Sequence, residues 1–122
     1  MRILLLIATL AACAAPPTHA DPAGIGAIVG SRAAGAAQQC VPVLSTRNAL
    51  QAIDGRTLFY RAGGTVWINR LAEDCSRMGP HSNLAVRMVG NRYCEGDPLY
   101  VLEGGSNQPV AVCALGRFTP YR

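Results

Sequence analysis

The sequence predicts a small, mainly β domain, stapled by disulfides, whose antiparallel sheet is open or partly closed into a barrel. Residues 40–122 consist of short β-prone runs separated by strong turn signals. Large apolar residues are sparse there, and so small a domain gains little stability from burial alone. The same region carries four cysteines: Cys40, Cys75, Cys94 and Cys113.

An export signal precedes this domain. Met1-Arg2 and the apolar run of residues 3–12 have the length of a signal-peptide core, and the run is too short to span a bilayer as a helix. Leu10-Ala11-Ala12-Cys13 resembles a lipobox, so we expect residues 1–12 to be removed and Cys13 to be lipidated. Ala14 follows that cysteine in place of an aspartate, which resembles the sorting signal for the outer membrane.

A second cleavage site competes with the first. Thr18-His19-Ala20 satisfies the small-residue rule of ordinary signal peptidase, with Pro16-Pro17 just upstream. Cleavage there would remove residues 1–20 and release a soluble periplasmic or secreted protein that begins at Asp21. We favour the lipobox because free cysteines are uncommon in exported proteins.

Residues 13–39 are predicted to be a flexible, lipidated tether rich in Ala, Gly and Pro. Such a composition buries too little surface to offset the entropy of ordering the backbone. The apolar cluster of Ile25, Ile28 and Val29 leaves an alternative, in which a short helix or strand docks on the domain.

Two turn signals predict a meander at the start of the domain. Asp54-Gly55 favours a type I′ turn between residues 49–53 and 56–61, and Gly63-Gly64 separates residues 57–61 from 65–69. Alternation places Leu58 and Tyr60 on one face and Phe59 on the other; it likewise sets Val66 and Ile68 opposite Trp67. Both faces carry bulky side chains, which indicates a sheet covered on both sides or curled.

Further strands are predicted over residues 84–89, 99–103, 110–113 and 117–121. Residues 70–83 are predicted to form a loop. A helical turn at 71–77 is an alternative, which Gly79-Pro80 would end.

The four domain cysteines remain under either cleavage site and predict two disulfides in an oxidising compartment. Three connectivities are open. We favour Cys75 with Cys94, which encloses the irregular middle, and Cys40 with Cys113, which ties the first strand to the last.

A metal site of Cys75, His81 and Cys94 is the weaker alternative, because intervals of five and twelve residues match no common zinc pattern. We predict no catalytic residue, no metal and no cofactor. His81 is the domain's one histidine and is expected to be solvated beside Ser82. Glu95 and Asp97 are expected to accept backbone hydrogen bonds in a turn.

Aromatic rings interleaved with arginines could line a ligand surface for a glycan, an anionic lipid or a protein. The candidate residues are Trp67, Tyr93, Arg61 and Arg92. We favour the alternative, in which most of the rings complete a core that is short of leucine. A net charge of +4 without a run of basic neighbours argues against a nucleic-acid partner.

One ordered set of segments in the chain matches a known pattern: Cys40, residues 54–59, residues 63–69, Leu71, Cys75, Cys94, Asp97 and residues 113–120. On these segments the chain resembles a family of small exported proteobacterial proteins, many of them lipoproteins, known as a domain of unknown function with four cysteines. The resemblance implies the domain boundary and the disulfides but no activity. It departs at Ala114, where the family usually has glycine.

These observations lead us to expect a cell-envelope lipoprotein that faces the periplasm and acts as a non-enzymatic binding or structural module. Its partners would be the membrane, through the lipid, and an envelope protein or a glycan. The alternative is a periplasmic inhibitor of a lytic enzyme or protease, with residues 76–83 as the inhibitory loop.

Overall fold

The protein, described here from a computed structural model over residues 23–43 and 49–122, is mainly β as predicted. The described part contains one short helix and nine strands, arranged in three antiparallel sheets. The sheets are not closed into a barrel, so that alternative is wrong. Cys13 and both candidate cleavage sites lie outside the described residues.

The largest sheet has the strand order β2 (Gln51–Ala52), β3 (Thr57–Ala62), β4 (Thr65–Arg70), β9 (Phe118–Tyr121). The hairpin predicted at Gly63-Gly64 is present, since Ala62 pairs with Thr65. Gly63 has a φ of +58° and Gly64 has no positive φ, which is the pattern of a type II′ turn.

The turn at Asp54-Gly55 differs from the predicted type I′ turn, because neither residue has a positive φ. The Asp54 carboxylate accepts a hydrogen bond from the Arg56 backbone N–H at 2.8 Å, and Ile53 N donates to Thr57 O at 2.8 Å. The aspartate therefore captures the N–H two residues ahead, as Asp does in an Asx turn. This lengthens the connection between β2 and β3.

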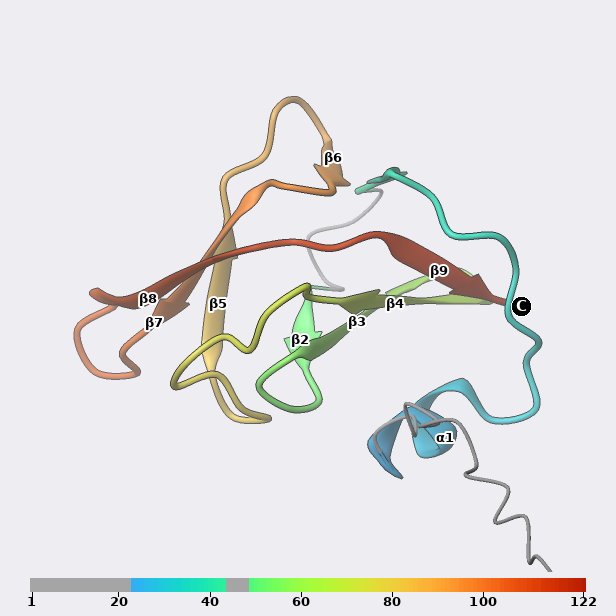
Figure 1. Ribbon diagram of the computed structural model, residues 1–122, viewed down its shortest axis with the longest axis horizontal. Helices are drawn as coiled ribbons and strands as arrows, with labels where there is room; N and C mark the ends of the chain where they lie inside the picture. The colour runs from blue at the N-terminus through green and yellow to red at the C-terminus, as the bar shows by residue number, and fades with distance from the viewer. Residues whose placement is uncertain (1–22, 44–48) are drawn as a thin grey trace, which may run out of the picture.

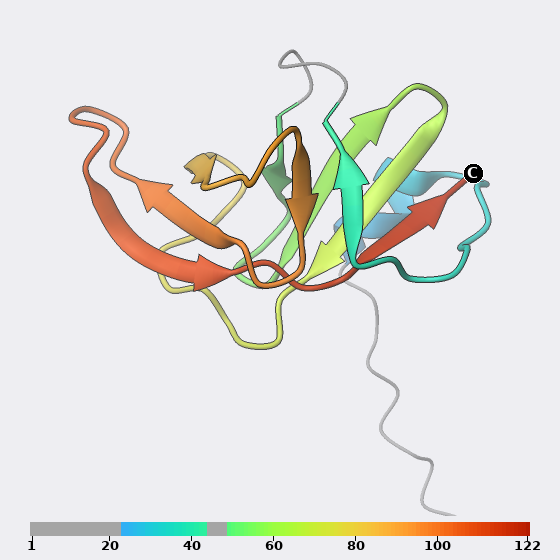
Figure 2. The same ribbon diagram turned by 90° about the horizontal axis from the view of Figure 1, so that it is seen from above.

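Two smaller sheets complete the fold (Figure 2). One has the order β5 (Asn83–Val86), β7 (Pro98–Leu102), β8 (Pro109–Ala114), and the other pairs β1 (Cys40–Pro42) with β6 (Arg92–Cys94). In Figure 2 the pair β1–β6 lies between the sheet that contains β7 and β8 and the sheet that contains β3 and β4. The chain crosses from one large sheet to the other between β8 and β9 (Figure 1).

The four-stranded sheet is covered on both faces, as the alternation predicts. Leu58, Tyr60 and Trp67 belong to the main core. On the opposite face Val66 and Ile68 pack against the helix α1 (Ala23–Val29). Figure 1 shows α1 beneath the β3–β4 hairpin.

Residues 13–39 were predicted to be a flexible tether, but their described part, residues 23–39, matches the alternative of a short helix docked on the domain. Ile25 of α1 is only 3% exposed. Its side chain packs on the apolar second face of the sheet, where burial removes apolar surface of both from water. After the helix the chain follows the edge strand β9. Ala33 exchanges hydrogen bonds with Arg122 at 3.0 and 3.1 Å, and Gln38 does so with Phe118 at 2.7 and 2.9 Å. The segment thus satisfies an edge that would otherwise expose unpaired amides, and the domain begins before Cys40.

All four domain cysteines form disulfides, but the favoured connectivity is wrong. Cys40 bonds to Cys94 and Cys75 bonds to Cys113. Cys40 and Cys94 lie directly opposite each other in the β1–β6 pair, with Cα atoms 4.1 Å apart. The pairing of β1 with β6 thus determines that Cys40 bonds to Cys94. The spacing of the cysteines in the sequence does not indicate this pairing.

Candidate functional site

A braced loop, which we define as residues 76–83, forms the candidate site. The backbone that leads into the loop is hydrogen-bonded to the turn between β2 and β3. The Arg56 guanidinium donates from Nε to Leu71 O at 2.9 Å and from Nη2 to Ala72 O at 2.7 Å. Cys75 N donates to Gly55 O at 2.7 Å. These bonds hold the backbone immediately before the loop in one position.

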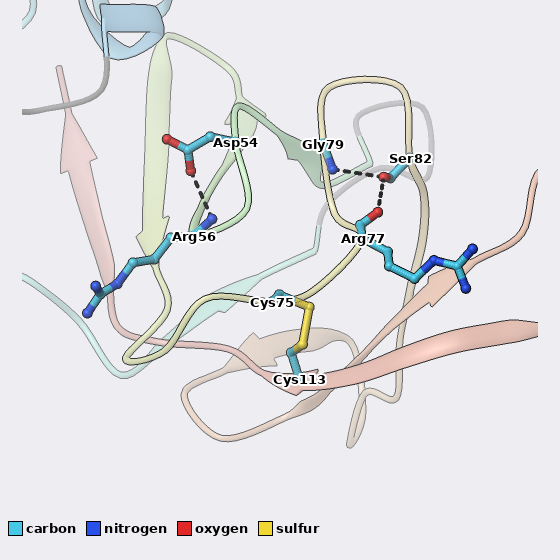
Figure 3. The surroundings of a disulfide bond; sticks show 7 residues. All are labelled: Asp54, Arg56, Cys75, Arg77, Gly79, Ser82 and Cys113. Atoms are coloured by element: carbon cyan, nitrogen blue, oxygen red, sulfur yellow. Dashed lines mark hydrogen bonds between the residues drawn. A yellow bond between two sulfur atoms is a disulfide. The ribbon is translucent and has the colours of Figure 1, made fainter.

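Two further attachments hold the start of the braced loop (Figure 3). The Cys75–Cys113 disulfide joins it to β8, with Cα atoms 5.9 Å apart. Met78 places its side chain in the main core and is 7% exposed. A covalent link and a buried anchor therefore flank Ser76 and Arg77, both of which are exposed.

The Ser82 hydroxyl closes the far end of the loop. It accepts from Gly79 N at 2.9 Å and donates to Arg77 O at 3.4 Å, and Ser82 N donates to Gly79 O at 3.0 Å. Figure 3 shows this serine bridging the two arms of the loop. The tip, Pro80 and His81, stays exposed between Gly79 and Ser82, which are bonded to each other.

Arg77 has a φ of +66°, in the left-handed region that favours glycine. A residue with a Cβ loses about 1–2 kcal/mol there. Its side chain extends away from the disulfide, outward from the loop (Figure 3). The positive φ marks Arg77 as a strained residue within the braced loop.

A groove of about 600 Å³ lies beside the braced loop and reaches the hairpin of β7 and β8. Its floor includes the apolar residues Met78, Val101 and Val110. Its lining also includes Arg77, His81 and Glu103. The groove therefore offers apolar contact together with charges of both signs.

The hydrogen bonds of Ser82 are those of a structural residue rather than of a catalytic nucleophile. The Ser82 hydroxyl is bonded to loop backbone, and His81 is exposed. Cys75 and Cys94 belong to different disulfides, so the alternative metal site has lost both thiolates. Within residues 23–43 and 49–122, no three His, Cys, Asp or Glu side chains gather as a metal site would require.

The four residues predicted to form a ligand surface do not lie on one surface. Trp67 is 7% exposed and Tyr93 is 9% exposed, because both rings complete the core. Tyr93 stands edge-on to Tyr60 at 5.5 Å and stacks with Phe118 at 6.4 Å between ring centroids. Burial raises the pKa of the Tyr93 phenol, with a smaller contribution from Tyr60.

The two arginines of that predicted surface are exposed in different places. Arg61 lies over the Phe59 ring, on the sheet face opposite to Trp67, with its guanidinium carbon 5.4 Å from the ring centroid. Arg92 is on β6. Trp67 instead faces Arg122, at 5.7 Å.

The turn that contains Glu95 and Asp97 has a structural role. Asp97 Oδ2 accepts from Cys94 N at 2.9 Å, as expected of a turn carboxylate. Glu95 forms an exposed ion pair with Arg117 at 3.2 Å. The two carboxylates thus have separate partners.

Comparison with protein-family models, with curated proteins and with solved structures found no match to this chain. Along the described ranges, the helix is too short to cross a bilayer. The sequence predicted residues 76–83 as a candidate loop but gave no structural role to Arg56 or Ser82, which hold it. Ser82 directly after Gly-Pro-His was the one local signal of a closed turn.

Proposed function

We propose that the protein is a cell-envelope lipoprotein, anchored through Cys13 at the outer membrane, whose domain is a non-enzymatic binding module. The observation that carries the proposal is the braced loop, which is exposed at its tip yet fixed by a disulfide, a buried methionine and a serine bridge. A contact surface ordered in advance loses little entropy when a partner binds.

The envelope assignment is supported by two features of the chain. The apolar run before Cys13 has the form of an export signal. All four cysteines of the domain are disulfide-bonded, and such bonds persist in oxidising compartments.

A test compares the full chain with two matched double variants in pull-downs from envelope extract. Arg77→Ala/His81→Ala removes two exposed side chains of the braced loop. Gln51→Ala/Arg61→Ala removes two exposed side chains of the four-stranded sheet. We expect an envelope protein or glycan to be retained by the wild type and the sheet variant and lost by the loop variant. Equal retention by all three, or no retention by the wild type, contradicts the proposal.

Inhibition of a lytic enzyme or protease is the second candidate, favoured by the rigidity of the loop. Rigid, disulfide-linked loops suit insertion into a concave active site. Assays of lysozyme and protease activity test it. Inhibition by the wild type that the loop variant lacks would support an inhibitor; inhibition that both proteins share would place the inhibitory surface elsewhere.

A further inference from the structure

The loop between β5 and β6, residues 87–91, exposes apolar side chains at its tip. Met88 is 40% exposed and Val89 is 72% exposed. Among the described residues the third large hydrophobic exposed to this degree is Val112, on β8. Figure 1 shows the loop at the top of the molecule, on the side opposite to α1. Adjacent exposed apolar residues on a projecting loop indicate a contact with something other than water.

Arginines flank this apolar tip on both sides. Arg87 and Arg92 are exposed, and residues 83–94 contain no acidic residue. Across the described ranges neither guanidinium has an ion pair. The nearest carboxylates along the chain, those of Glu95 and Asp97, are bonded to Arg117 and to Cys94 N. The tip therefore carries two positive charges without compensation.

The foot of the loop is fixed, so the tip is held outward. Val43 N donates to Asn91 O at 2.8 Å, and Arg87 N donates to Pro98 O at 3.0 Å. Gly90 has a φ of +72°, which permits the reversal of the chain beside Val89.

A groove of about 450 Å³ at this foot combines apolar and basic residues. Its lining includes the apolar residues Val41, Pro42 and Val89 together with Arg92. Apolar surface bordered by unpaired arginines matches the boundary of a bilayer, where acyl chains meet phosphates.

We propose that residues 87–92 dock on the surface of an anionic phospholipid bilayer. Met88 and Val89 enter the boundary between headgroups and acyl chains, and Arg87 and Arg92 bind lipid phosphates. Charge complementarity selects this occupant over an apolar protein surface, which would leave both guanidinium groups unpaired. The inference does not depend on the braced loop, which is a separate surface.

Tryptophan fluorescence tests the docking at a single position, so that a lipid anchor elsewhere in the chain does not affect the result. Val89→Trp and the matched control Val112→Trp are made in the full chain, whose native Trp67 gives both the same buried background. The proteins are mixed with vesicles of brominated phosphatidylcholine, with or without phosphatidylglycerol. We expect quenching and a blue shift at position 89 with phosphatidylglycerol, and neither at position 112.

Charge removal provides the second arm. Arg87→Gln/Arg92→Gln in the Val89→Trp chain should lower the equilibrium constant for docking of the loop on anionic vesicles, read from quenching at position 89, about thirtyfold. Added salt should weaken it as well. The proposal is overturned if position 89 stays unquenched, if it is quenched no more than position 112, or if neutral vesicles act as well as anionic ones.

Discussion

Asn69 and Gly116 join the four-stranded sheet to the segment between β8 and β9 through a pair of hydrogen bonds. Asn69 Nδ2 donates to Gly116 O at 2.8 Å, and Gly116 N donates to Asn69 Oδ1 at 2.9 Å. Asn69 belongs to β4 and is fully buried, and Gly116 lies where the chain crosses from β8 to β9. The side-chain amide thus replaces a strand partner for this crossing segment.

Replacing Asn69 should destabilise the fold strongly. Asn69→Ala leaves two backbone groups of Gly116 without partners in a buried place, so we expect a loss of about 2–4 kcal/mol in the free energy of unfolding. Urea denaturation measures it. Asn91→Ala is the matched control, because Asn91 is exposed, and should change stability by less than about 0.5 kcal/mol.

Gly116→Ala should be at least as damaging, for a steric reason. A Cβ at this position would collide with the backbone carbonyl oxygen of Arg70, which no rotamer change can relieve. We expect the variant to unfold at a lower urea concentration than the wild type. A midpoint equal to that of the wild type would contradict the close approach of these two segments.

The docked helix predicts a stability effect that a flexible tether would not show. Ile25→Ala removes a buried side chain that packs with Val66 and Ile68, and should cost about 2–4 kcal/mol. Gly26→Ala, in the same helix, should instead stabilise by about 0.5–1 kcal/mol, because its Cβ would meet open space. Thermal melts of both variants measure these effects. If neither melting temperature changes, the helix is not docked and the segment is a flexible tether.

Hydrogen exchange can distinguish the local effect of the Ser82 bridge on the braced loop from an effect on the stability of the whole domain. In Ser82→Ala both disulfides remain, yet Gly79 N loses its acceptor; we expect faster exchange at Gly79, by about a factor of five to ten. Exchange in β3 and β4 should stay unchanged. If protection at Gly79 persists, the serine bridge does not hold the loop.

Alkaline pH should destabilise the protein through Tyr93. Because burial raises the pKa of this phenol above its ordinary value of 10.0, the unfolded chain releases the proton first. The stability that Tyr93 contributes is full below pH 10 and is lost as the pH rises through the higher native pKa. In Tyr93→Phe the urea midpoint should fall less steeply above pH 10 than in the wild type. If it falls as steeply, the alkaline loss of stability comes from other groups.

Local signals predicted much of the β structure. Gly63-Gly64 between two alternating runs fixed one hairpin, and the bulk on both sides of residues 57–69 implied a sheet covered twice. The runs near 84, 99, 110 and 117 became β5, β7, β8 and β9. Each of these features depends on neighbours in the chain, which a single sequence records.

Features that depend on distant partners escaped prediction. The pairing of Cys40 with Cys94 follows from β1 and β6, two short strands with no pattern of their own. Docking of α1 was only the alternative to a flexible tether, because its apolar partners Val66 and Ile68 lie far along the chain. The rings of Trp67 and Tyr93 look alike in sequence whether they face ligand or core, and only the packing decides between the two.

Disulfide mapping provides the sharpest test, because the proposed binding module relies on a loop held by covalent sulfur links made outside the cytosol. Protein purified from the envelope would be digested without reduction, and the linked peptides identified by mass spectrometry. The account predicts the pairs Cys40–Cys94 and Cys75–Cys113 and no free thiol among these four residues. Free thiols at these positions, or any other pairing, would contradict it.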